Sequence, residues 1–319
     1  GPQTRRTRIC LARDLRSNLY GLVFTLFAFI PFPALLRLPP ATPLADLQHT
    51  ASPKTHFERR RMFVTLKPPL KWAGGKRWLV PHLKPIWDSH SERRYVEPFC
   101  GGLAVVLGLQ PRRALLNDIN PHLINFYRHL QNGMQPQIEM RNNEQLFYRH
   151  RERFNQLIQN GGAKSSEAAE LFYYLNRTCF NGLCRFNKGG GFNVPFGTYS
   201  RINYASDFSQ YARSFKQWQF TNVDVEAVAI EPTDFVYADP PYDVEFTTYS
   251  AGGFSWEDQQ RTAELLAKHR GPVVISNQAT ARIIELYQDL GFELRYLDGP
   301  RRISCTGDRT AAREVLAIK

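Results

Sequence analysis

Residues 95–102 read Tyr95-Val-Glu-Pro-Phe-Cys-Gly-Gly102, a short apolar run that leads into a turn with two adjacent glycines. A helical pattern of apolar residues follows, so a strand, a glycine-rich turn and a helix are predicted in succession. Rossmann-like sheets hold nucleotides with this geometry, because glycine lets the backbone approach a ligand closely. By itself, the pattern is equally typical of a tight strand-to-helix turn that binds nothing.

The next predicted strand covers residues 114–118 and ends within Leu115-Leu-Asn-Asp-Ile-Asn120. An acidic residue at the end of this strand, about twenty residues after the glycine turn, can accept hydrogen bonds from ribose hydroxyls. Asp118 has that position, although it could equally cap the helix that begins near Pro121. Asn120 is better placed for the cap, which leaves Asp118 free for a ligand.

Strands and helices continue to alternate toward the C-terminus, which predicts a mostly parallel α/β sheet. Residues 137–180 are predicted to be largely helical with a turn near 161–166, and residues 181–204, rich in Gly, Asn and aromatic residues, to form a loop or hairpin. The remaining predicted elements are strands at 234–238, 273–276, 292–297 and 314–318, and a helix at 283–290 followed by Gly291.

Upstream of the first strand lies Leu70-Lys-Trp-Ala-Gly-Gly-Lys76. The adjacent glycines permit close approach of a ligand, Trp72 offers a flat apolar face, and Lys71 and Lys76 offer positive charge. An ordinary loop before a helix would explain the glycines but not an exposed tryptophan between two lysines. We therefore expect this segment to contact a ligand.

The most specific motif is Asp239-Pro-Pro-Tyr242, which follows the predicted strand at 234–238. Ligands of open α/β sheets bind beyond the carboxyl ends of the strands, and two prolines stiffen the turn and remove two N–H donors. The Asp239 carboxylate, a backbone carbonyl before or between the prolines, and the Tyr242 ring then converge. A reaction at an exocyclic amine needs this set of groups. The lone pair of the amine is delocalised into the ring, and acceptors on both N–H groups expose that lone pair. A rigid surface turn is the alternative.

The net charge of +12 over 319 residues favours a polyanionic partner such as nucleic acid. Residues 1–61 hold ten of the 41 Lys and Arg and three of the 29 Asp and Glu, so they carry +7 and the rest of the chain only +5. Charge alone is therefore weak support for DNA. Scattered cysteines without CxxC or zinc spacing favour a reduced, cytoplasmic compartment and are expected to be small buried hydrophobes: Cys10, Cys100, Cys179, Cys184 and Cys305.

Residues 1–61 differ from the rest of the chain. Gly1-Pro2 is typical of residues left by cloning, and an arginine-rich start precedes an apolar run at 19–36 that two prolines interrupt. A signal peptide or membrane anchor has this order, but the run is short for a membrane span of about 20 residues. We expect a poorly ordered extension without function, with Met62 as a candidate natural start.

Six segments, in one order, resemble those of Dam-type (D12 class) N6-adenine-specific DNA methyltransferases. They are LKWAGGK, VEPFCGG, NDIN, YLNRTCFNGLCRFN, FNVPFGTY and DPPY, and the resemblance spans about residue 66 to the C-terminus. It implies a Rossmann-like class I sheet that binds S-adenosylmethionine, formed by residues 62–120 and 206–319, with an inserted, mainly helical target-recognition domain at 121–205. It also implies methyl transfer to N6 of adenine in double-stranded DNA, within GATC, by base flipping.

The same resemblance assigns the site residues. No metal is implied, because the cofactor supplies the leaving group. The catalytic motif comprises Asp239, Pro240, Pro241 and Tyr242; the cofactor-binding residues are Trp72, Ala73, Gly74, Gly75, Lys76, Glu97, Pro98, Phe99, Asp118 and Asp239; the DNA-binding residues are Lys71, Phe180, Asn181, Leu183, Arg185, Pro195 and Tyr199.

Residues of the recognition segment match those that read bases in the family. Arg185 matches an arginine that reads a guanine, in line with the bidentate pairing of arginine with guanine O6 and N7. Lys71 matches a lysine that reads the first guanine, and Leu183 and Pro195 match residues that pack against thymine. Four basic residues would hold phosphates, or else form a solvated face: Arg177, Arg185, Lys188 and Arg201.

Phe180 matches the aromatic residue that enters the duplex when the base leaves it, and Tyr199 matches a DNA-contacting tyrosine. The chain departs from the family at Phe99-Cys-Gly-Gly-Leu103, where the glycine spacing differs, and at Thr198, where relatives can carry a basic residue. The sequence also diverges after Arg-Arg-Ile-Ser at 301–304. These departures leave the turn geometry, one phosphate contact and the flanking-sequence preference open.

Two other functions stay open. A methyltransferase of RNA adenine or of cytosine N4 would share the geometry for exocyclic amines, and a DNA-binding protein with an inactive cofactor site would keep the recognition segment. Arg185 favours duplex DNA, and the complete set of motif residues favours catalysis. We expect a cytoplasmic bacterial, phage or nucleoid-associated monomer that binds double-stranded DNA without a membrane or an obligate protein partner. Whether it accompanies a restriction nuclease stays open.

Overall fold

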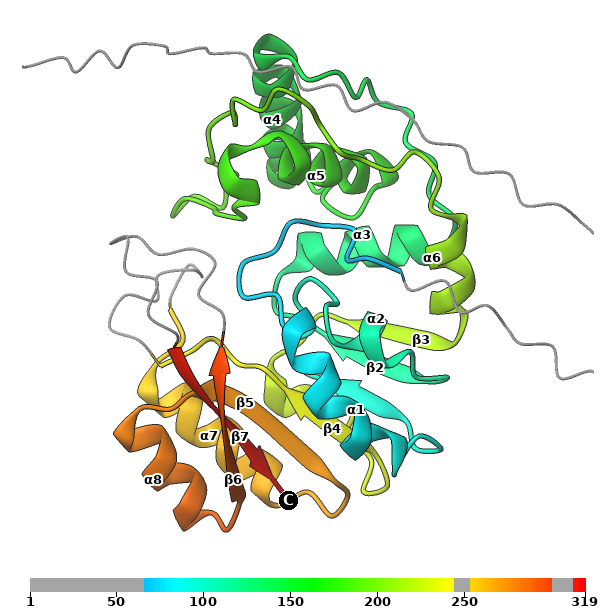
Figure 1. Ribbon diagram of the computed structural model, residues 1–319. Coiled ribbons are helices and arrows are strands. Elements are labelled where there is room, and N and C mark those ends of the chain that lie inside the picture. The colour runs from blue at the N-terminus through cyan, green and yellow to red at the C-terminus, as the bar shows by residue number, and fades with distance from the viewer. Residues whose placement is uncertain (1–65, 244–252, 300–311) are drawn as a thin grey trace, which may run out of the picture. The chain divides into compact units, whose positions relative to one another are not determined.

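The part of the chain that the structure describes contains a seven-stranded sheet in the order β3-β2-β1-β4-β5-β7-β6. The computed structural model describes residues 66–243, 253–299 and 312–319 (Figure 1). The five strands from β3 to β5 are parallel, and β7 lies antiparallel between β5 and β6. The expected Rossmann-like α/β sheet is confirmed, although β3 is not among the predicted elements. The strands are β1 (Tyr95–Glu97), β2 (Ala114–Asn117), β3 (Trp218–Thr221), β4 (Phe235–Ala238), β5 (Val273–Gln278), β6 (Glu293–Gly299) and β7 (Ala312–Ile318).

Successive residues of the central strands face opposite sides of the sheet, and both sides are buried. Tyr95 of β1 and Tyr237 of β4 pack in one hydrophobic core, whereas Val96 and Val236 pack in the other. Strands covered on both faces have continuous apolar sequences, which is why their positions could be predicted. The first core includes residues of α1 (Val80–Asp88), α2 (Val106–Leu109) and α3 (Pro121–Gln131), and the second includes residues of α7 (Trp256–Ala267) and α8 (Ala281–Asp289).

Helix α3 packs on the sheet and on the helical segment that follows it in the chain. Arg128 of α3 donates to the Phe220 carbonyl of β3 at 2.7 Å, and Asn125 donates to the Ser165 carbonyl at 3.1 Å. Asn120 caps α3 as expected, since its side chain accepts from two backbone N–H groups of the first turn. The segment contains α4 (Glu144–Gln159) and α5 (Ser166–Thr178), which pack against each other, with α5 also against α3 (Figure 1).

The predicted helices and turn at 137–180 are confirmed. Residues 181–204 form a loop with two single β-bridges, Cys179 with Phe196 and Phe186 with Phe192. Cys100 and Cys179 are buried as expected, and Cys184 is partly buried. The remaining short helices are η1 (Arg77–Leu79), η2 (Phe180–Gly182), α6 (Ser209–Ser214), η3 (Phe215–Gln217) and η4 (Val225–Ala227).

Several expectations fall on residues outside the described ranges. They concern the extension at 1–61, Met62, Cys305 and the divergent residues 301–304. In the part of the chain that the structure does describe, no helix has the length and apolar character needed to span a membrane.

Candidate functional site

The turn after β4 places Asp239 beside β5, at the carboxyl ends of the parallel strands. The Ser276 hydroxyl on β5 donates to the Asp239 carboxylate, with Oγ and Oδ1 2.8 Å apart. The other carboxylate oxygen lies 3.4 Å from the Lys76 ammonium. The Asp239 side chain is 20% exposed, so a ligand at this edge can reach it.

Lys76 joins residues 70–76 to the turn after β4. Its side chain is 8% exposed, and its ammonium also donates to the Gly74 carbonyl at 3.1 Å. The same ammonium lies 4.2 Å from the centre of the Tyr242 ring. A buried charge is costly unless it is paired, and Asp239 and the ring face provide that pairing. Lys76 was expected from the sequence to offer charge, but its ion pair with Asp239 was not, because no local pattern reveals it.

The two proline carbonyls of the turn differ in their partners. The Gln259 amide on α7 donates to the Pro241 carbonyl at 2.6 Å. Gln259 is 3% exposed, and Asn277 on β5 donates to its side-chain oxygen at 3.0 Å. The Pro240 carbonyl, by contrast, has no hydrogen-bond partner among the described residues. The sequence left open which carbonyl could serve as an acceptor, and the bond from Gln259 to Pro241 makes the carbonyl of Pro240, a buried residue, the candidate.

Trp72 is partly buried, so the expectation of an exposed tryptophan at this position is wrong. Its indole lies on the glycine pair that follows β1, because a Cβ on Gly101 would be 2.9 Å from Trp72 Nε1 and one on Gly102 would be 2.7 Å from Trp72 Cβ. Gly101 also has a φ of +42°, in the left-handed region that favours glycine. These two glycines therefore make room for Trp72. The exposed bend next to Trp72 consists of Ala73, Gly74 and Gly75.

Asp118 is less free than the sequence suggested, because both carboxylate oxygens accept backbone N–H groups. Gly101 donates to Oδ2 at 3.0 Å and Asn120 donates to Oδ1 at 2.9 Å. Burial raises the pKa of Asp118 to about 6, although these two bonds act in the opposite direction. A carboxylate has about four lone-pair positions, so Asp118 can still accept hydrogen bonds from a ligand. Phe99, in the turn after β1, is partly buried.

Ile119 is an apolar residue that the sequence analysis missed. It is 65% exposed and directly follows Asp118, at the end of β2. A large apolar side chain directly after the end of a buried strand is the sequence signal that could have identified Ile119. It offers an exposed apolar side chain next to the hydrogen-bond acceptors of Asp118.

Glu97 lies at the end of β1 and is 3% exposed. The Tyr95 hydroxyl donates to its carboxylate at 3.0 Å. Burial raises the pKa of Glu97 well above its ordinary value, and the charges of Asp239 and Asp118 raise it further, whereas the Tyr95 bond lowers it. Three acidic side chains thus gather at the carboxyl ends of β1, β2 and β4.

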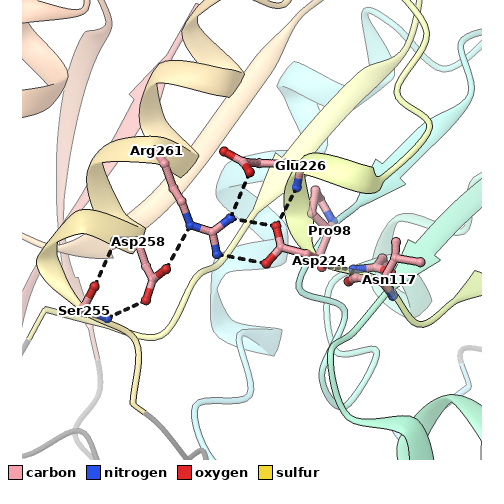
Figure 2. A network of polar contacts seen from close by, with 8 residues as sticks. Pro98, Asn117, Asp224, Glu226, Ser255, Asp258 and Arg261 are labelled. Atoms are coloured by element: carbon pink, nitrogen blue, oxygen red, sulfur yellow. Dashed lines mark hydrogen bonds and ion pairs between the residues drawn. The ribbon is translucent and has the colours of Figure 1, made fainter.

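The segment after β3 is held at the same edge by an arginine network (Figure 2). Arg261 on α7 makes two contacts with Asp224, of 2.7 and 2.9 Å, and one with Asp258 at 2.9 Å. Asn117 at the end of β2 donates to the Pro98 carbonyl at 3.1 Å. Pro98 was expected from the sequence, whereas the other residues of this network were missed. Asp224 was missed because β3, the strand before it, was not predicted. An acidic residue shortly after a strand is the signal that could have found Asp224.

Residues 70–76 also contact the helical segment, through Asn176 of α5. The Asn176 side chain accepts from the Lys71 N–H at 2.9 Å and donates to the Lys71 carbonyl at 2.8 Å and to the Gly182 carbonyl at 3.2 Å. The Lys71 ammonium donates to the Arg177 carbonyl at 3.1 Å and lies 3.6 Å from the centre of the Tyr199 ring. Burial, and next the charge of Arg177, lower the pKa of Lys71. The structure thereby brings Lys71 and Tyr199 together.

The turn η2 carries two of the expected DNA-binding residues on the surface. Phe180 is 51% exposed, and Asn181 is exposed with a φ of +53°. The Phe180 N–H donates to the carbonyl of Pro195, itself exposed, at 2.9 Å. Leu183 is partly buried because it packs against the hydrophobic core.

The basic residues of this region differ in exposure and in hydrogen bonding. Arg185 is exposed, and its Nε donates to the Asn193 side chain at 2.8 Å. Lys188 and Arg201 are exposed, whereas Arg177 is partly buried and donates to a backbone carbonyl. Within the described ranges, no three His, Cys, Asp or Glu side chains are grouped so that they could hold a metal ion.

The Asp239 carboxylate, the Tyr242 ring and a proline carbonyl without a partner among the described residues therefore lie in one turn at the edge of the sheet. A family model for D12 class N6 adenine-specific DNA methyltransferase matches residues 72–303. The chain belongs to this family. Its members are S-adenosylmethionine-dependent enzymes, so the expected family, enzyme class and cofactor are confirmed and the protein is an adenine-specific DNA methyltransferase.

Similar DNA methyltransferases also align with most of the chain. A DNA adenine methylase of Vibrio cholerae is 37% identical over 270 residues, which are 78% of this chain and 94% of that protein. The retron Ec67 DNA adenine methylase of Escherichia coli is 33% identical over 263 residues, 78% of this chain and 90% of that protein. The type II methyltransferase M1.LlaDCHI of Lactococcus lactis subsp. cremoris is 33% identical over 261 residues, 75% of this chain and 89% of that protein.

Proposed function

We propose that this D12-class enzyme transfers the methyl group of S-adenosylmethionine to N6 of adenine within GATC in double-stranded DNA, after flipping the base out of the helix. The observation that carries the proposal is the convergence of three groups in the turn after β4. They are the Asp239 carboxylate, the Pro240 carbonyl, which has no partner among the described residues, and the Tyr242 ring.

The acceptors suit an exocyclic amine. Asp239 accepts one N–H of the adenine amine and the Pro240 carbonyl accepts the other, so the nitrogen lone pair is directed away from the ring system. The Tyr242 ring stacks on the base, a contact that is worth about 1–3 kcal/mol per base in comparable sites. The gain in rate comes from placing the nitrogen correctly and from acceptors that are already oriented.

The residues at the ends of β1 and β2 fit the cofactor. Asp118 retains lone pairs for ribose hydroxyls, and Ile119 offers apolar surface to the adenine ring of the cofactor. The bound cofactor would also be surrounded by Glu97, Phe99, Lys76 and the bend after Trp72. When bound, S-adenosylmethionine supplies a methyl group on a sulfonium leaving group. No metal is needed for that chemistry.

The DNA would be read by the surface turn and the loop after it. Arg185 pairs with a guanine, Lys71 reads the first guanine, and Leu183 and Pro195 contact the thymine methyl. Phe180, which is 51% exposed, fills the space that the flipped adenine leaves. Asn181 and Tyr199 add contacts to the DNA.

We assign target recognition to residues 121–205 and catalysis to residues 62–120 and 206–319. Helix α3 contacts both β3 and the start of α5, so it connects the two functions. We also propose that the enzyme acts as a monomer on bacterial or phage DNA in the cytoplasm, without an obligate protein partner. Whether it accompanies a restriction nuclease can be tested from the genes beside its own.

The proposal is tested by methylating unmethylated plasmid with the protein and S-adenosylmethionine. The plasmid is then digested with two nucleases, one blocked by adenine methylation at GATC and one dependent on it. We expect protection from the first and cutting by the second. If neither pattern changes and sequencing finds N6-methyladenine elsewhere, the GATC assignment is wrong. If no N6-methyladenine is found, the DNA substrate itself is wrong, and RNA adenine and cytosine N4 are tested next.

A further inference from the structure

Tyr242 is held at its far end by a residue of the last strand, Glu314. The Tyr242 hydroxyl donates to Glu314 Oε2 at 2.6 Å. We infer that Glu314 is a positioning residue, which fixes the Tyr242 ring in the orientation that receives the target base. This inference rests on the proposed function, because it assumes that a flipped adenine stacks on Tyr242.

The antiparallel strand β7 is what brings Glu314 to the site. Glu314 lies opposite Gln278 at the end of β5 and opposite Leu297 of β6, near the edge where the parallel strands end. A Cβ on Gly299 would be 2.6 Å from Glu314 Oε1, so the absence of a side chain at this position makes room for the carboxylate. The sheet is thus built to place an acidic group next to the turn after β4.

Glu314 is 9% exposed, and a carboxylate at that depth needs strong partners. Burial raises its pKa, whereas the charge of Lys76 and the bond from Tyr242 lower it. The Tyr242 hydroxyl is therefore its main hydrogen-bonding partner among the described residues, and the short distance indicates a strong bond. Nothing in the catalytic chemistry requires Glu314 itself, which leaves orientation of the ring as its contribution.

The Tyr242 ring is held from two further directions. The Lys76 ammonium lies 4.2 Å from the ring centre and covers one face, so a base can stack only on the other face. The backbone of the turn is held by Gln259 through the Pro241 carbonyl. Without the bond to Glu314, the hydroxyl end of the ring is free to swing about the Cα–Cβ bond, and the stacking plane is no longer defined.

The test measures single-turnover methylation, DNA affinity and melting temperature for Glu314→Ala, Glu314→Gln and Tyr242→Phe. We expect Glu314→Ala to lose about tenfold in methylation rate, because misplacement of the reacting atoms is costly, while its DNA affinity changes by less than about twofold. Glu314→Gln keeps an oxygen acceptor for the Tyr242 hydroxyl and should recover most of the rate. Glu293→Ala, which removes an exposed carboxylate of β6, is the matched control and should leave the rate unchanged.

A double-mutant cycle separates positioning from a general loss of structure. In the Tyr242→Phe background, Glu314→Ala should cause no further loss of rate, because the bond is already absent. Additive losses, or a wild-type rate in Glu314→Ala, would overturn the inference. If Glu314→Ala does not fold, Tyr242→Phe alone decides, since it also removes the bond, and a wild-type rate there rejects the role. Failure of the wild-type protein to methylate DNA in the same assay would instead reject the proposed function, and this inference with it.

Discussion

Asp118 shows how one residue can serve both the fold and a ligand. It accepts one N–H from the glycine turn after β1 and one from the start of α3, and so joins two segments of the cofactor-binding edge. The sequence predicted its position at a strand end but not these bonds, because Gly101 is separated from it by a helix and a strand. Its remaining lone pairs are the ones that we assign to the ribose.

Cofactor affinity should therefore depend on the ionisation of Asp118. Burial raises its pKa to about 6, and only the carboxylate form accepts hydrogen bonds at both oxygens. By calorimetry, the Kd for S-adenosylmethionine should be constant above about pH 7 and rise by about tenfold per unit below about pH 6. Asp118→Asn should bind more weakly at every pH and show no such dependence. Wild-type affinity that stays flat down to pH 5 would contradict the assignment.

The stability of the ligand-free protein should change with pH in the opposite direction. The pKa of Asp118 in the folded chain, about 6, lies above its ordinary value, so the folded state takes up the proton more readily than the unfolded chain. Protonation of Asp118 therefore stabilises the folded state below about pH 4, and this stabilisation is lost as the pH rises to about 6.

Among the contacts between elements, the one between residues 70–76 and α5 matters most, and we call this contact the joint. Asn176 satisfies both the N–H and the carbonyl of Lys71 and also the Gly182 carbonyl of η2, and it is 2% exposed. The motif that contains Asn176 was recognised from the sequence, but its role was not, because side-chain bonds to a distant backbone leave no periodic signal. The joint connects the loop that contacts Asp239 to the turn that carries Phe180.

Asn176→Ala should lower the free energy of unfolding by about 1–3 kcal/mol, because it leaves buried backbone groups of Lys71 and Gly182 without partners. DNA affinity should fall as well, since η2 loses its support. The measurements are urea denaturation and DNA binding. Asn160→Ala, at the exposed end of α4, is the matched control and should change neither. Equal stability of the two variants would show that the joint contributes nothing.

Across the whole molecule, the sequence predicted the central strands, which are covered on both faces, and the order of the motifs. It did not predict β3, a four-residue strand at the edge of the sheet, where alternating exposure replaces a continuous apolar run. It also missed Gln259 and Glu314, whose contacts with the turn after β4 join residues far apart in the chain. Such contacts depend on how the sheet is assembled, so they become visible only in three dimensions.

DNA affinity should depend on salt through the exposed cations of the recognition segment. Lys188→Ala should reduce the slope of log K against log salt by about 1, because one phosphate contact and its released counterion are lost. Lys268→Ala, an exposed lysine after α7, is the control and should leave the slope unchanged. Equal slopes for Lys188→Ala and the wild type would show that the loop does not touch the DNA backbone.

The catalytic role of Asp239 is tested by single-turnover methylation of a GATC duplex by Asp239→Ala. Melting temperature and DNA affinity are measured alongside, because the substitution also removes the partner of the buried Lys76 ammonium. With the fold and DNA binding intact, we expect a loss of at least about 100-fold in rate, in line with the removal of one oriented electrostatic group from an active site. Near wild-type methylation by a folded Asp239→Ala would contradict this role.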